Sequence, residues 1–387
     1  MIRREIEPEL IKLAKQFKAV AVIGPRQSGK TTLTRHVFDN KPYVNLENPD
    51  SRRFALDDPR GFLFQYGSGA VIDEAQRAPE IFSYLQQLLD DSSLKGRFVL
   101  TGSNNFLLQE TISQSLAGRI AYLYLLPFTL AELPPGNDVD PATRIISGSY
   151  PPVYDQRIDP DLWYPNYIRT YVERDVRQLK NISDLNIFDR FLRLCAGRSG
   201  QLLNLSSLAL DAGVDNKTAG AWISVLENSF IVFRLYPFHR NFNKRIIKMP
   251  KLYFYDTGLV CSLLGISNAG QLNLHPLYGN IFENLIVSEF KKHVLNRSVN
   301  EDIFFWRDNV GHEIDIIIDK KDSFVPVEIK SGKTVTDEFF KGIKYWQRLT
   351  GLPSGSVIYG GDETYSYSDG RQAISWRNPE TLFNQKI

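Results

Sequence analysis

The sequence predicts an α/β protein with a parallel-sheet core, a mostly helical middle segment and a second α/β unit towards its C-terminus. Three patterns lead to this prediction. Buried strand-like runs alternate with helical patterns between Ile6 and Gly102. Helical periodicity then dominates from Leu162 to about Leu264, and three strand-like runs follow a helical stretch after Gly279. Strands that alternate with helices favour a parallel sheet.

Length and composition limit the class of protein. The 387 residues are enough for two or three domains with cores of their own. Hydrophobic residues make up 43% and charged residues 23%, which excludes a largely disordered chain. The formal net charge is only +2, so a nucleic-acid surface would have to be a local patch.

Cysteine usage and hydropathy indicate the compartment. The two cysteines, Cys195 and Cys261, lie far apart, which argues against a disulfide framework or a zinc knuckle and favours a reducing environment. Charged residues interrupt the apolar ones from Met1 to Gln16, unlike in a signal peptide. No uncharged apolar run approaches the roughly 20 residues of a membrane-spanning helix. We therefore expect a soluble, cytoplasmic protein that does not bind a membrane.

The first domain should contain three buried strands. Apolar residues at helical spacing run from Ile6 to Phe17 and lead into the strand "AVAVI", which ends at Gly24. Further core strands are predicted at "AVID", from Ala70 to Asp73, and at "FVLTG", from Phe98 to Gly102, with the amphipathic helix "IFSYLQQLL" between them. A loop rich in Pro, Gly and Asp, from Pro134 to Arg144, marks the end of this domain.

A phosphate-binding loop (P-loop) follows the first strand. The stretch "GPRQSGKTT" separates two glycines by four residues and places Lys30 and Thr31 directly after the second. The backbone N–H groups can surround a phosphate, Lys30 can reach the β and γ phosphates for binding and catalysis, and Thr31 can coordinate magnesium. The predicted cofactors are ATP and Mg²⁺, and the predicted binding residues are Gly24, Pro25, Arg26, Gln27, Ser28, Gly29, Lys30, Thr31 and Thr32. The alternative is a chance glycine turn before a helix.

The second strand ends in an acidic pair. In "AVIDEAQ", Asp73 fits a carboxylate that orients magnesium, and Glu74 fits a base that polarises the attacking water. The pair therefore predicts hydrolysis of ATP as well as binding. The alternative is an acidic pair that caps the next helix.

Two further groups are candidates for contact with the γ-phosphate. The stretch "TGSNN" ends the third strand and offers Ser103 or Asn104 to sense the phosphate or position water, although small polar residues also build turns. The stretch "SLAGRI" offers Arg119 as an arginine finger for the nucleotide of a neighbouring subunit, which would require a homo-oligomer. A solvated arginine is the alternative.

The middle segment combines a helix pair with a basic stretch. Two helices meet at Gly213 and precede an apolar strand-like run, a pattern that resembles a winged helix-turn-helix. Between Asn228 and Tyr255 there is no acidic residue, and aromatic residues separate the basic ones, which are Arg234, Arg240, Lys244, Arg245, Lys248 and Lys251. Such a stretch suits a nucleic-acid backbone. The alternatives are a solvated basic loop and a surface for the nucleotide of the first domain. Asp256 is expected to cap a turn or helix.

The last unit carries a pattern of carboxylates and a lysine. The runs "HEIDIIID" and "VPVEIK" place Asp315, Glu328 and Lys330 on two strands, and alternation puts each strand's polar pair on one face. Glu283, on the preceding helix, offers another carboxylate. Glu283, Asp315 and Glu328 are candidate metal ligands, and Asp315, Glu328 and Lys330 are candidate catalytic groups for phosphodiester cleavage. The alternative is an ion-paired, exposed sheet face.

Over nearly its whole length the chain resembles bacterial and archaeal ATPases of the AAA type that carry a C-terminal domain of unknown function, number 4143, with a restriction-endonuclease-like fold. Besides "GPRQSGKTT" and "VIDEAQ", the similar elements are "VNLENP", "LTGSNN", "SLAGR", "YVERDV", "KLYFYDTGL", "FEN" and "EIDIII...VEIKSG". The resemblance implies ATP binding by residues 24–32, a role of Asp73 and Glu74 in magnesium binding and hydrolysis, and a nuclease-type signature at Asp315, Glu328 and Lys330. The proline that usually precedes the first of these is Ile314 here, so the motif has the looser Glu-x-Asp form.

These expectations divide the chain into an AAA-type P-loop ATPase domain (1–140), a helical winged-helix domain (141–270) and a restriction-endonuclease-like domain (271–387). The expected activity is hydrolysis of ATP with Mg²⁺, coupled to binding of nucleic acid, with DNA favoured over RNA, and to metal-dependent cleavage by the last domain. One competing hypothesis is a regulatory switch that binds a protein partner through a non-catalytic C-terminal domain. Another is a DNA-binding ATPase without cleavage.

Overall fold

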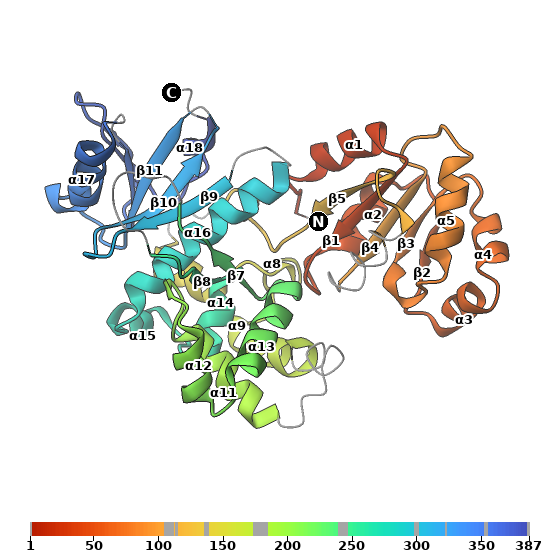
Figure 1. The fold of residues 1–387 in the computed structure, drawn as a ribbon, viewed down its shortest axis with the longest axis horizontal. Helices are drawn as coiled ribbons and strands as arrows, with labels where there is room; N and C mark the ends of the chain where they lie inside the picture. The colour runs from red at the N-terminus through yellow and green to blue at the C-terminus, as the bar shows by residue number, and fades with distance from the viewer. Residues whose placement is uncertain are drawn as a thin grey trace. The chain divides into compact units, whose positions relative to one another are not determined.

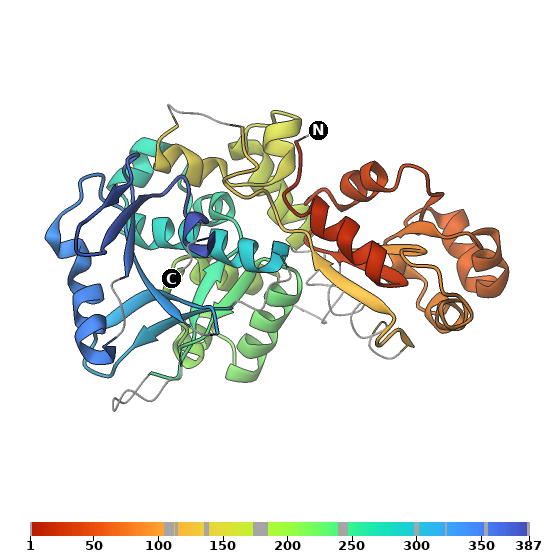
Figure 2. The same ribbon diagram turned by 90° about the horizontal axis from the view of Figure 1, so that it is seen from above.

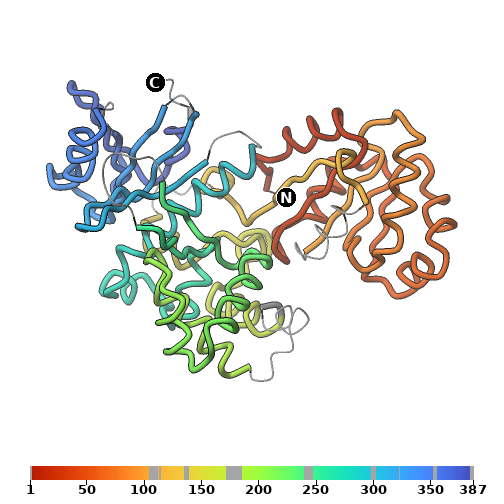
Figure 3. The backbone as a smooth tube through the Cα atoms, in the orientation of Figure 1, coloured from red at the N-terminus to blue at the C-terminus, as the bar shows by residue number. Residues whose placement is uncertain are grey.

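The computed structural model describes residues 2–103, 112, 115–134, 139–172, 185–238, 247–297, 302–321, 323–351 and 355–384. The chain forms two compact units. Unit 1 contains Met1–Phe128, Asn228–Phe230 and Leu295–Ser298, and unit 2 contains Thr129–Glu227, Ile231–Val294 and Val299–Ile387. Figure 1 labels many of the helices and strands of each unit, and Figure 3 traces the backbone through them.

Unit 1 is built on a five-stranded sheet in the order β2-β3-β4-β1-β5, and all neighbouring strands are parallel. Its strands are β1 (Ala19–Ile23), β2 (Tyr43–Asn45), β3 (Ala70–Asp73), β4 (Phe98–Gly102) and β5 (Ile120–Tyr124). Its helical elements are α1 (Glu7–Gln16), α2 (Lys30–Val37), α3 (Pro49–Asp57), α4 (Pro59–Gln65), η1 (Ala75–Arg77) and α5 (Ile81–Asp90). The parallel sheet and the three core strands that the sequence predicts are confirmed.

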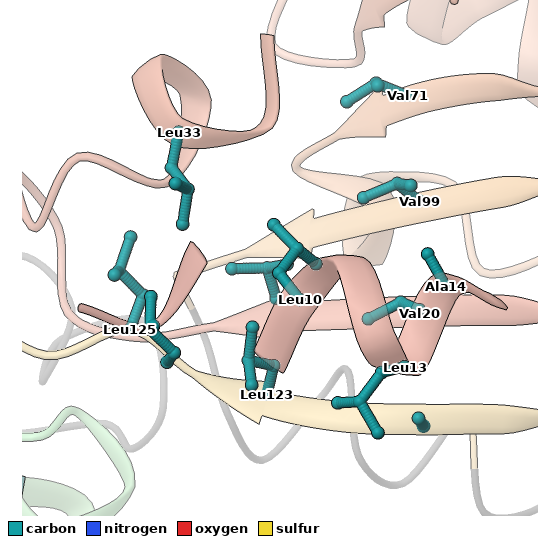
Figure 4. Packing of buried hydrophobic residues seen from close by; sticks show 12 residues of the cluster. Leu10, Leu13, Ala14, Val20, Leu33, Val71, Val99, Leu123 and Leu125 are labelled. Atoms are coloured by element: carbon teal, nitrogen blue, oxygen red, sulfur yellow. The ribbon is translucent and has the colours of Figure 1, made fainter. Parts of the chain in front are cut away.

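The core of unit 1 explains why these strands form. Every residue of β1, β3 and β4 is buried, which is typical of a parallel sheet covered on both faces. Helix α1 turns its apolar side towards β1 and β5, and the close view of this packing is Figure 4. The cluster consists of Ile6, Leu10, Leu13, Ala14, Val20, Val22, Leu33, Val71, Val99, Ala121, Leu123 and Leu125.

The first part of unit 2 is mostly helical, as the sequence predicts. Its helical elements are α7 (Pro141–Ser147), α8 (Pro151–Asp155), α9 (Pro160–Tyr167), η2 (Ile168–Val172), α11 (Leu185–Ala196), α12 (Leu205–Ala212), α13 (Asn216–Asn228), α14 (Thr257–Leu264) and α15 (Ala269–Leu274). An antiparallel sheet in the order β6-β8-β7 joins them, made of β6 (Gln201–Leu202), β7 (Val232–Leu235) and β8 (Lys251–Phe254). Gly213 lies between α12 and α13 at the predicted turn, and Asp256 caps α14 by accepting a hydrogen bond from the backbone N–H of Leu259 at 2.9 Å.

The second part of unit 2 is a mixed sheet in the order β13-β14-β12-β11-β10-β9, drawn in blue in Figure 2. Helix α16 (Tyr278–Arg297) precedes it, and η3 (Asp337–Phe340) and α17 (Lys341–Thr350) lie between its third and fourth strands in the chain. The strands are β9 (Asp302–Arg307), β10 (Glu313–Asp319), β11 (Phe324–Lys330), β12 (Ser356–Tyr359), β13 (Tyr365–Ser366) and β14 (Gln372–Ser375), and α18 (Thr381–Asn384) follows. In the described part of the chain, no helix has both the length and the apolar character needed to cross a membrane.

We predict that Leu10→Ala selectively weakens unit 1. Leu10 is fully buried, so its truncation should lower the free energy of unfolding by about 2–5 kcal/mol. The five tryptophans, at positions 163, 222, 306, 346 and 376, all belong to unit 2. In urea, the far-UV circular dichroism transition should therefore shift while the tryptophan fluorescence transition does not. Ile11→Ala is the matched control because Ile11 is 37% exposed, and an equal shift in both variants would contradict the packing described here.

Candidate functional site

The P-loop of unit 1 connects β1 to α2 and has the backbone conformation that a phosphate-binding loop needs. Gly29 precedes α2 with φ 92°, a left-handed conformation that favours glycine. Gly24 lies so close to the carbonyl oxygen of Leu125 that a Cβ atom there would collide with it. Both glycines are therefore required by the path of the chain.

Lys30 and Ser28 are the buried polar side chains of this loop. The Lys30 ammonium group donates hydrogen bonds to the carbonyl oxygens of Gly24 and Pro25 at 3.0 and 2.8 Å, so it lies across the mouth of the loop. The Ser28 hydroxyl is buried and has no hydrogen-bond partner among the described residues. A cation and an unsatisfied hydroxyl beside a helix N-terminus fit a bound phosphate group.

The carboxylate of Asp73, at the end of β3, collects hydroxyl groups from three elements. Thr31 at the start of α2 donates to one of its oxygens at 2.7 Å, and Tyr43 of β2 donates to the same oxygen at 2.6 Å. Thr101 of β4 donates to the other oxygen. Asp73 is only 3% exposed. The partial burial of Tyr43 and its contact with the Asp73 carboxylate raise the pKa of the Tyr43 hydroxyl. The predicted magnesium ligands Thr31 and Asp73 therefore lie side by side.

Glu74 has an unusual backbone conformation, and hydrogen bonds fix the position of its side chain. Its φ of 54° lies in the left-handed region, which is uncommon for a residue with a side chain and often marks a functional position. Ser103 donates to one of its carboxylate oxygens at 3.0 Å, and Gln76 donates to the same oxygen at 2.6 Å. The predicted pair Glu74 and Ser103 is thus brought together, while Asn104 lies outside the described residues.

Arg119 lies at the opposite edge of the sheet from the P-loop. It directly precedes β5, and its carbonyl oxygen accepts a hydrogen bond from Ala19, the first residue of β1, whereas the P-loop follows the last residue of β1. Its guanidinium forms two hydrogen bonds with Asp90 of α5, at 2.6 and 2.8 Å, and this interaction lowers the pKa of Asp90. Its role as an arginine finger for another subunit stays a prediction.

In unit 2, the predicted carboxylate and lysine residues form one cluster. Lys330 donates to Glu328 at 2.5 Å and lies 3.7 Å from a carboxylate oxygen of Asp315. The same oxygen of Asp315 accepts a hydrogen bond from the backbone N–H of Ile329 at 2.8 Å. Burial, followed by the charge of Asp315, raises the pKa of Glu328 to about 8.

A second lysine, which the sequence analysis did not assign to this site, enters the cluster from β8. Lys251 forms ion pairs with Glu283 of α16, at 2.9 Å, and with Glu313 of β10. Tyr253, also on β8, donates to Glu283 at 2.5 Å, and Arg307 pairs with Glu313 at 3.0 Å. The side chain of Lys251 is only 4% exposed. The name acidic cluster is used below for Glu283, Glu313, Asp315 and Glu328.

The donor set of the acidic cluster has the chemistry of a magnesium or manganese site, but its carboxylates are bound to protein groups. A divalent cation there would have to displace Lys330 or Lys251 from the carboxylates. Within the described ranges, no three His, Cys, Asp or Glu side chains form a group that could hold a metal ion. The metal role of Glu283, Asp315 and Glu328 therefore stays a prediction.

The basic stretch of the middle segment differs from the expected nucleic-acid surface. Lys251 is buried in the acidic cluster, and Arg234 makes two hydrogen bonds with Glu227, at 2.8 and 2.6 Å. Lys248 is exposed, and Arg240, Lys244 and Arg245 lie outside the described residues. The prediction of a nucleic-acid contact is wrong for Lys251, whose side chain is only 4% exposed, because a positive charge in a sequence does not reveal its partner. For Arg234, whose side chain is 33% exposed, it stays a prediction.

We predict that Lys251→Met strongly destabilises unit 2. The substitution leaves Glu283 and Glu313 without their shared cation, and breaking a buried ion pair from one side costs about 3–5 kcal/mol. Urea unfolding followed by tryptophan fluorescence measures this loss, and adding Glu313→Gln should recover part of it. Lys341→Met is the control, since Lys341 and its partner Glu338 are both exposed. Equal stability of both single variants would show that the cluster contributes nothing.

Three family profiles match consecutive parts of the chain. Residues 16–134 match a profile described as an AAA domain. Residues 140–270 match a domain of unknown function, DUF8612, and residues 278–378 match another, DUF4143. Together with the parallel sheet, the AAA domain supports binding and hydrolysis of ATP as the general activity. The AAA domain and the domain of unknown function 4143 that the resemblance implied are thus confirmed, whereas the nuclease-like fold of the latter stays a prediction.

Two solved structures show a distant likeness to this chain. The Walker-type ATPase PABY2304 of Pyrococcus abyssi is 14% identical with a TM-score of 0.46, over 68% of this chain and 96% of that one. RuvB of Thermotoga maritima is 17% identical with a TM-score of 0.28, over 60% of this chain and 90% of that one. Likenesses at such scores carry no argument about this chain.

Relatives in sequence are closer. The uncharacterized proteins Rv2008c of Mycobacterium tuberculosis and Mb2031c of Mycobacterium bovis are each 30% identical over 378 residues, which cover 96% of this chain and 83% of the relative. An uncharacterized protein of Haemophilus influenzae is 23% identical over 366 residues, with 85% of this chain and 86% of that protein covered. The chain belongs to the family of the uncharacterized mycobacterial proteins Rv2008c and Mb2031c.

Proposed function

We propose that unit 1 hydrolyses ATP at a site formed by the P-loop, Asp73, Glu74 and Ser103. The observation that carries this proposal is the hydrogen bond of 2.7 Å between Thr31, directly after the P-loop lysine, and the buried Asp73. It joins the phosphate-binding helix α2 to the acidic end of β3. A P-loop without such a carboxylate would support binding of a nucleotide but would not point to hydrolysis.

Each group of the P-loop has a role in binding. Backbone N–H groups of residues 24–32 surround the phosphates, and the N-terminus of α2 adds partial positive charge. Lys30 turns from the carbonyl oxygens of Gly24 and Pro25 to the β and γ phosphates. Thr31 and Asp73 would hold Mg²⁺, which neutralises charge on the phosphate oxygens.

Glu74 is the group that polarises the attacking water. Its carboxylate is held by Ser103 and Gln76, so it accepts a proton from a fixed position. In this proposal Ser103, at the end of β4 and bonded to Glu74, also orients this water. Because β4 lies between β1 and β3, the ends of these strands bring the P-loop, Glu74 and Ser103 to one edge of the sheet.

We predict that two substitutions separate binding from hydrolysis. Lys30→Ala should abolish turnover and weaken nucleotide binding, because it removes the cation that meets the phosphates. Glu74→Gln should keep binding and lower kcat about 10²–10⁴-fold, because the amide cannot accept a proton. Steady-state hydrolysis and fluorescent ADP binding measure the two effects. Glu80→Gln, an exposed acid on the same segment, is the control, and full turnover by Glu74→Gln would remove Glu74 from the mechanism.

We further propose that unit 2 couples this ATPase to nucleic acid, with DNA favoured. The order α11-β6-α12-α13-β7-β8 supports the winged-helix interpretation of residues 141–270, because a helix pair is followed by an antiparallel β7–β8 pair. The domain division at residues 140 and 270 belongs to the same proposal. The exposed Lys248 lies on the segment that joins β7 to β8, where a wing would contact phosphate groups.

Cleavage by residues 271–387 is the second candidate function. The observation that favours it is the position of Lys330 beside both Glu328 and Asp315 on neighbouring strands. Against it stands the internal neutralisation of the acidic cluster by Lys251 and Lys330. If the cluster is not catalytic, the alternative is a nucleotide-dependent switch in which unit 2 binds a protein partner.

We predict that DNA stimulates ATP turnover and that salt removes the stimulation, because contacts with phosphate groups weaken steeply with ionic strength. Turnover is measured with duplex DNA, single-stranded DNA and no DNA, and nicking is measured in the same samples with Mn²⁺. Manganese-dependent nicking that Asp315→Ala abolishes would establish cleavage. A rate of ATP turnover that is the same with duplex DNA, with single-stranded DNA and without DNA would favour the switch that binds a protein partner.

A further inference from the structure

Arg4 is a buried arginine at the start of unit 1 that the sequence analysis did not single out. It is 6% exposed and lies three residues before the first residue of α1, Glu7, whose backbone N–H donates a hydrogen bond to the Arg4 carbonyl oxygen at 3.2 Å. Ile6 and Leu10, just after it, are fully buried in the core. The position of Arg4 is therefore fixed by the packing of α1 on the sheet.

The guanidinium of Arg4 bonds the P-loop. Its Nη1 donates to the carbonyl oxygen of Ser28 at 2.8 Å. The same nitrogen lies 3.7 Å from the place where a Cβ atom of Gly29 would be. A P-loop turns its N–H groups inwards to the phosphates, which leaves carbonyl groups on its outer side. A buried carbonyl there needs a donor, and Arg4 supplies a charged one.

The other side of the guanidinium bonds residues 125–128, the last residues of the first stretch of unit 1. Its Nη2 donates to the carbonyl oxygen of Leu126 at 2.7 Å, and the guanidinium carbon Cζ lies 4.8 Å from the ring centre of Phe128. The same segment contacts the start of the P-loop. The backbone N–H of Leu125 donates to the carbonyl oxygen of Ile23 at 2.7 Å, and the carbonyl oxygen of Leu125 lies where a side chain at Gly24 would be. The segment 125–128 therefore meets the P-loop directly at Gly24 and through Arg4 at Ser28.

We propose that Arg4 is a positioning residue of the nucleotide site: it holds the P-loop in its phosphate-binding conformation and ties that conformation to residues 125–128. The proposal rests on the proposed ATPase function of unit 1. Arg4 acts through the Ser28 carbonyl group and does not need to touch the nucleotide. Since the loop holds the phosphates in the bound and transition states alike, loss of Arg4 weakens both equally, which raises KM and leaves kcat nearly unchanged.

The test compares Arg4→Gln, Arg4→Lys and Arg3→Gln with the wild-type full-length chain. We expect Arg4→Gln to raise the KM for ATP and the Kd for fluorescent ADP about tenfold, the factor of roughly one hydrogen bond to a charged donor. The kcat should stay within about threefold. Arg4→Lys keeps the positive charge but lacks the second hydrogen-bonding nitrogen of the guanidinium. Its KM should therefore lie between that of the wild type and that of Arg4→Gln. Arg3 is exposed, and Arg3→Gln should equal the wild type.

The outcomes separate a positioning role from a structural one. A folded Arg4→Gln with a lower melting temperature but wild-type KM and Kd would overturn the proposal, because a purely structural residue changes stability alone. If Arg4→Gln does not fold, a folded Arg4→Lys with wild-type KM overturns it equally. Failure of the wild type to bind ATP or ADP would overturn the ATPase function and the role of Arg4 together, whereas turnover sensitive to Lys30→Ala and insensitive to Arg4→Gln would overturn the role of Arg4 alone.

Discussion

The buried carboxylate of Asp73 is the group on which the geometry of the nucleotide site depends. Its three hydrogen-bond donors come from α2, β2 and β4, so one side chain aligns the P-loop helix with the strands beside it. A carboxylate that is 3% exposed must have such donors, because an unsatisfied buried charge is very unfavourable. The donors are hydroxyl groups, which satisfy the oxygens and leave the negative charge in place. That charge is what a magnesium ion beside a phosphate needs.

The carboxylates of the acidic cluster in unit 2 have cationic partners, unlike Asp73, whose partners are neutral hydroxyl groups. The cluster's carboxylates are matched by Lys251, Lys330 and Arg307, so the protein supplies the cations itself. Ion pairs of this kind are costly to break from one side yet add little to stability compared with an apolar core. The hydroxyl partners in unit 1 bring no cation to Asp73, whereas the cationic partners in unit 2 already occupy the carboxylates that a metal ion would need.

Local patterns predicted the elements, and long-range contacts account for what they missed. The strands at 19–23, 70–73 and 98–102 and the P-loop follow from apolar runs and glycine spacing, which are properties of short windows. Tyr43, Lys251 and Arg4 reach their sites through contacts across the fold. Tyr43 meets Asp73 because β2 pairs with β3, Lys251 meets Glu313 across two sheets, and Arg4 meets Leu126 at a separation of 122 residues. No window of sequence contains such information. The positive charge of Lys251 suggested a nucleic-acid surface because its acidic partners, Glu283 and Glu313, are distant in the sequence.

Helix α16 explains why the middle and last parts of the chain form one unit. Asn284, fully buried, accepts a hydrogen bond from the backbone N–H of Phe254 and donates one to its carbonyl group, at 2.7 and 2.9 Å, so it pairs with β8 as a neighbouring strand would. One residue earlier, Glu283 accepts from Lys251 and Tyr253 of the same strand. The short elements "FEN" and "KLYFYDTGL" thus face each other. Buried polar contacts tolerate little displacement. Any displacement of β8 would therefore separate Lys251 from Glu283 and Glu313, so these contacts hold the middle and last parts of unit 2 together.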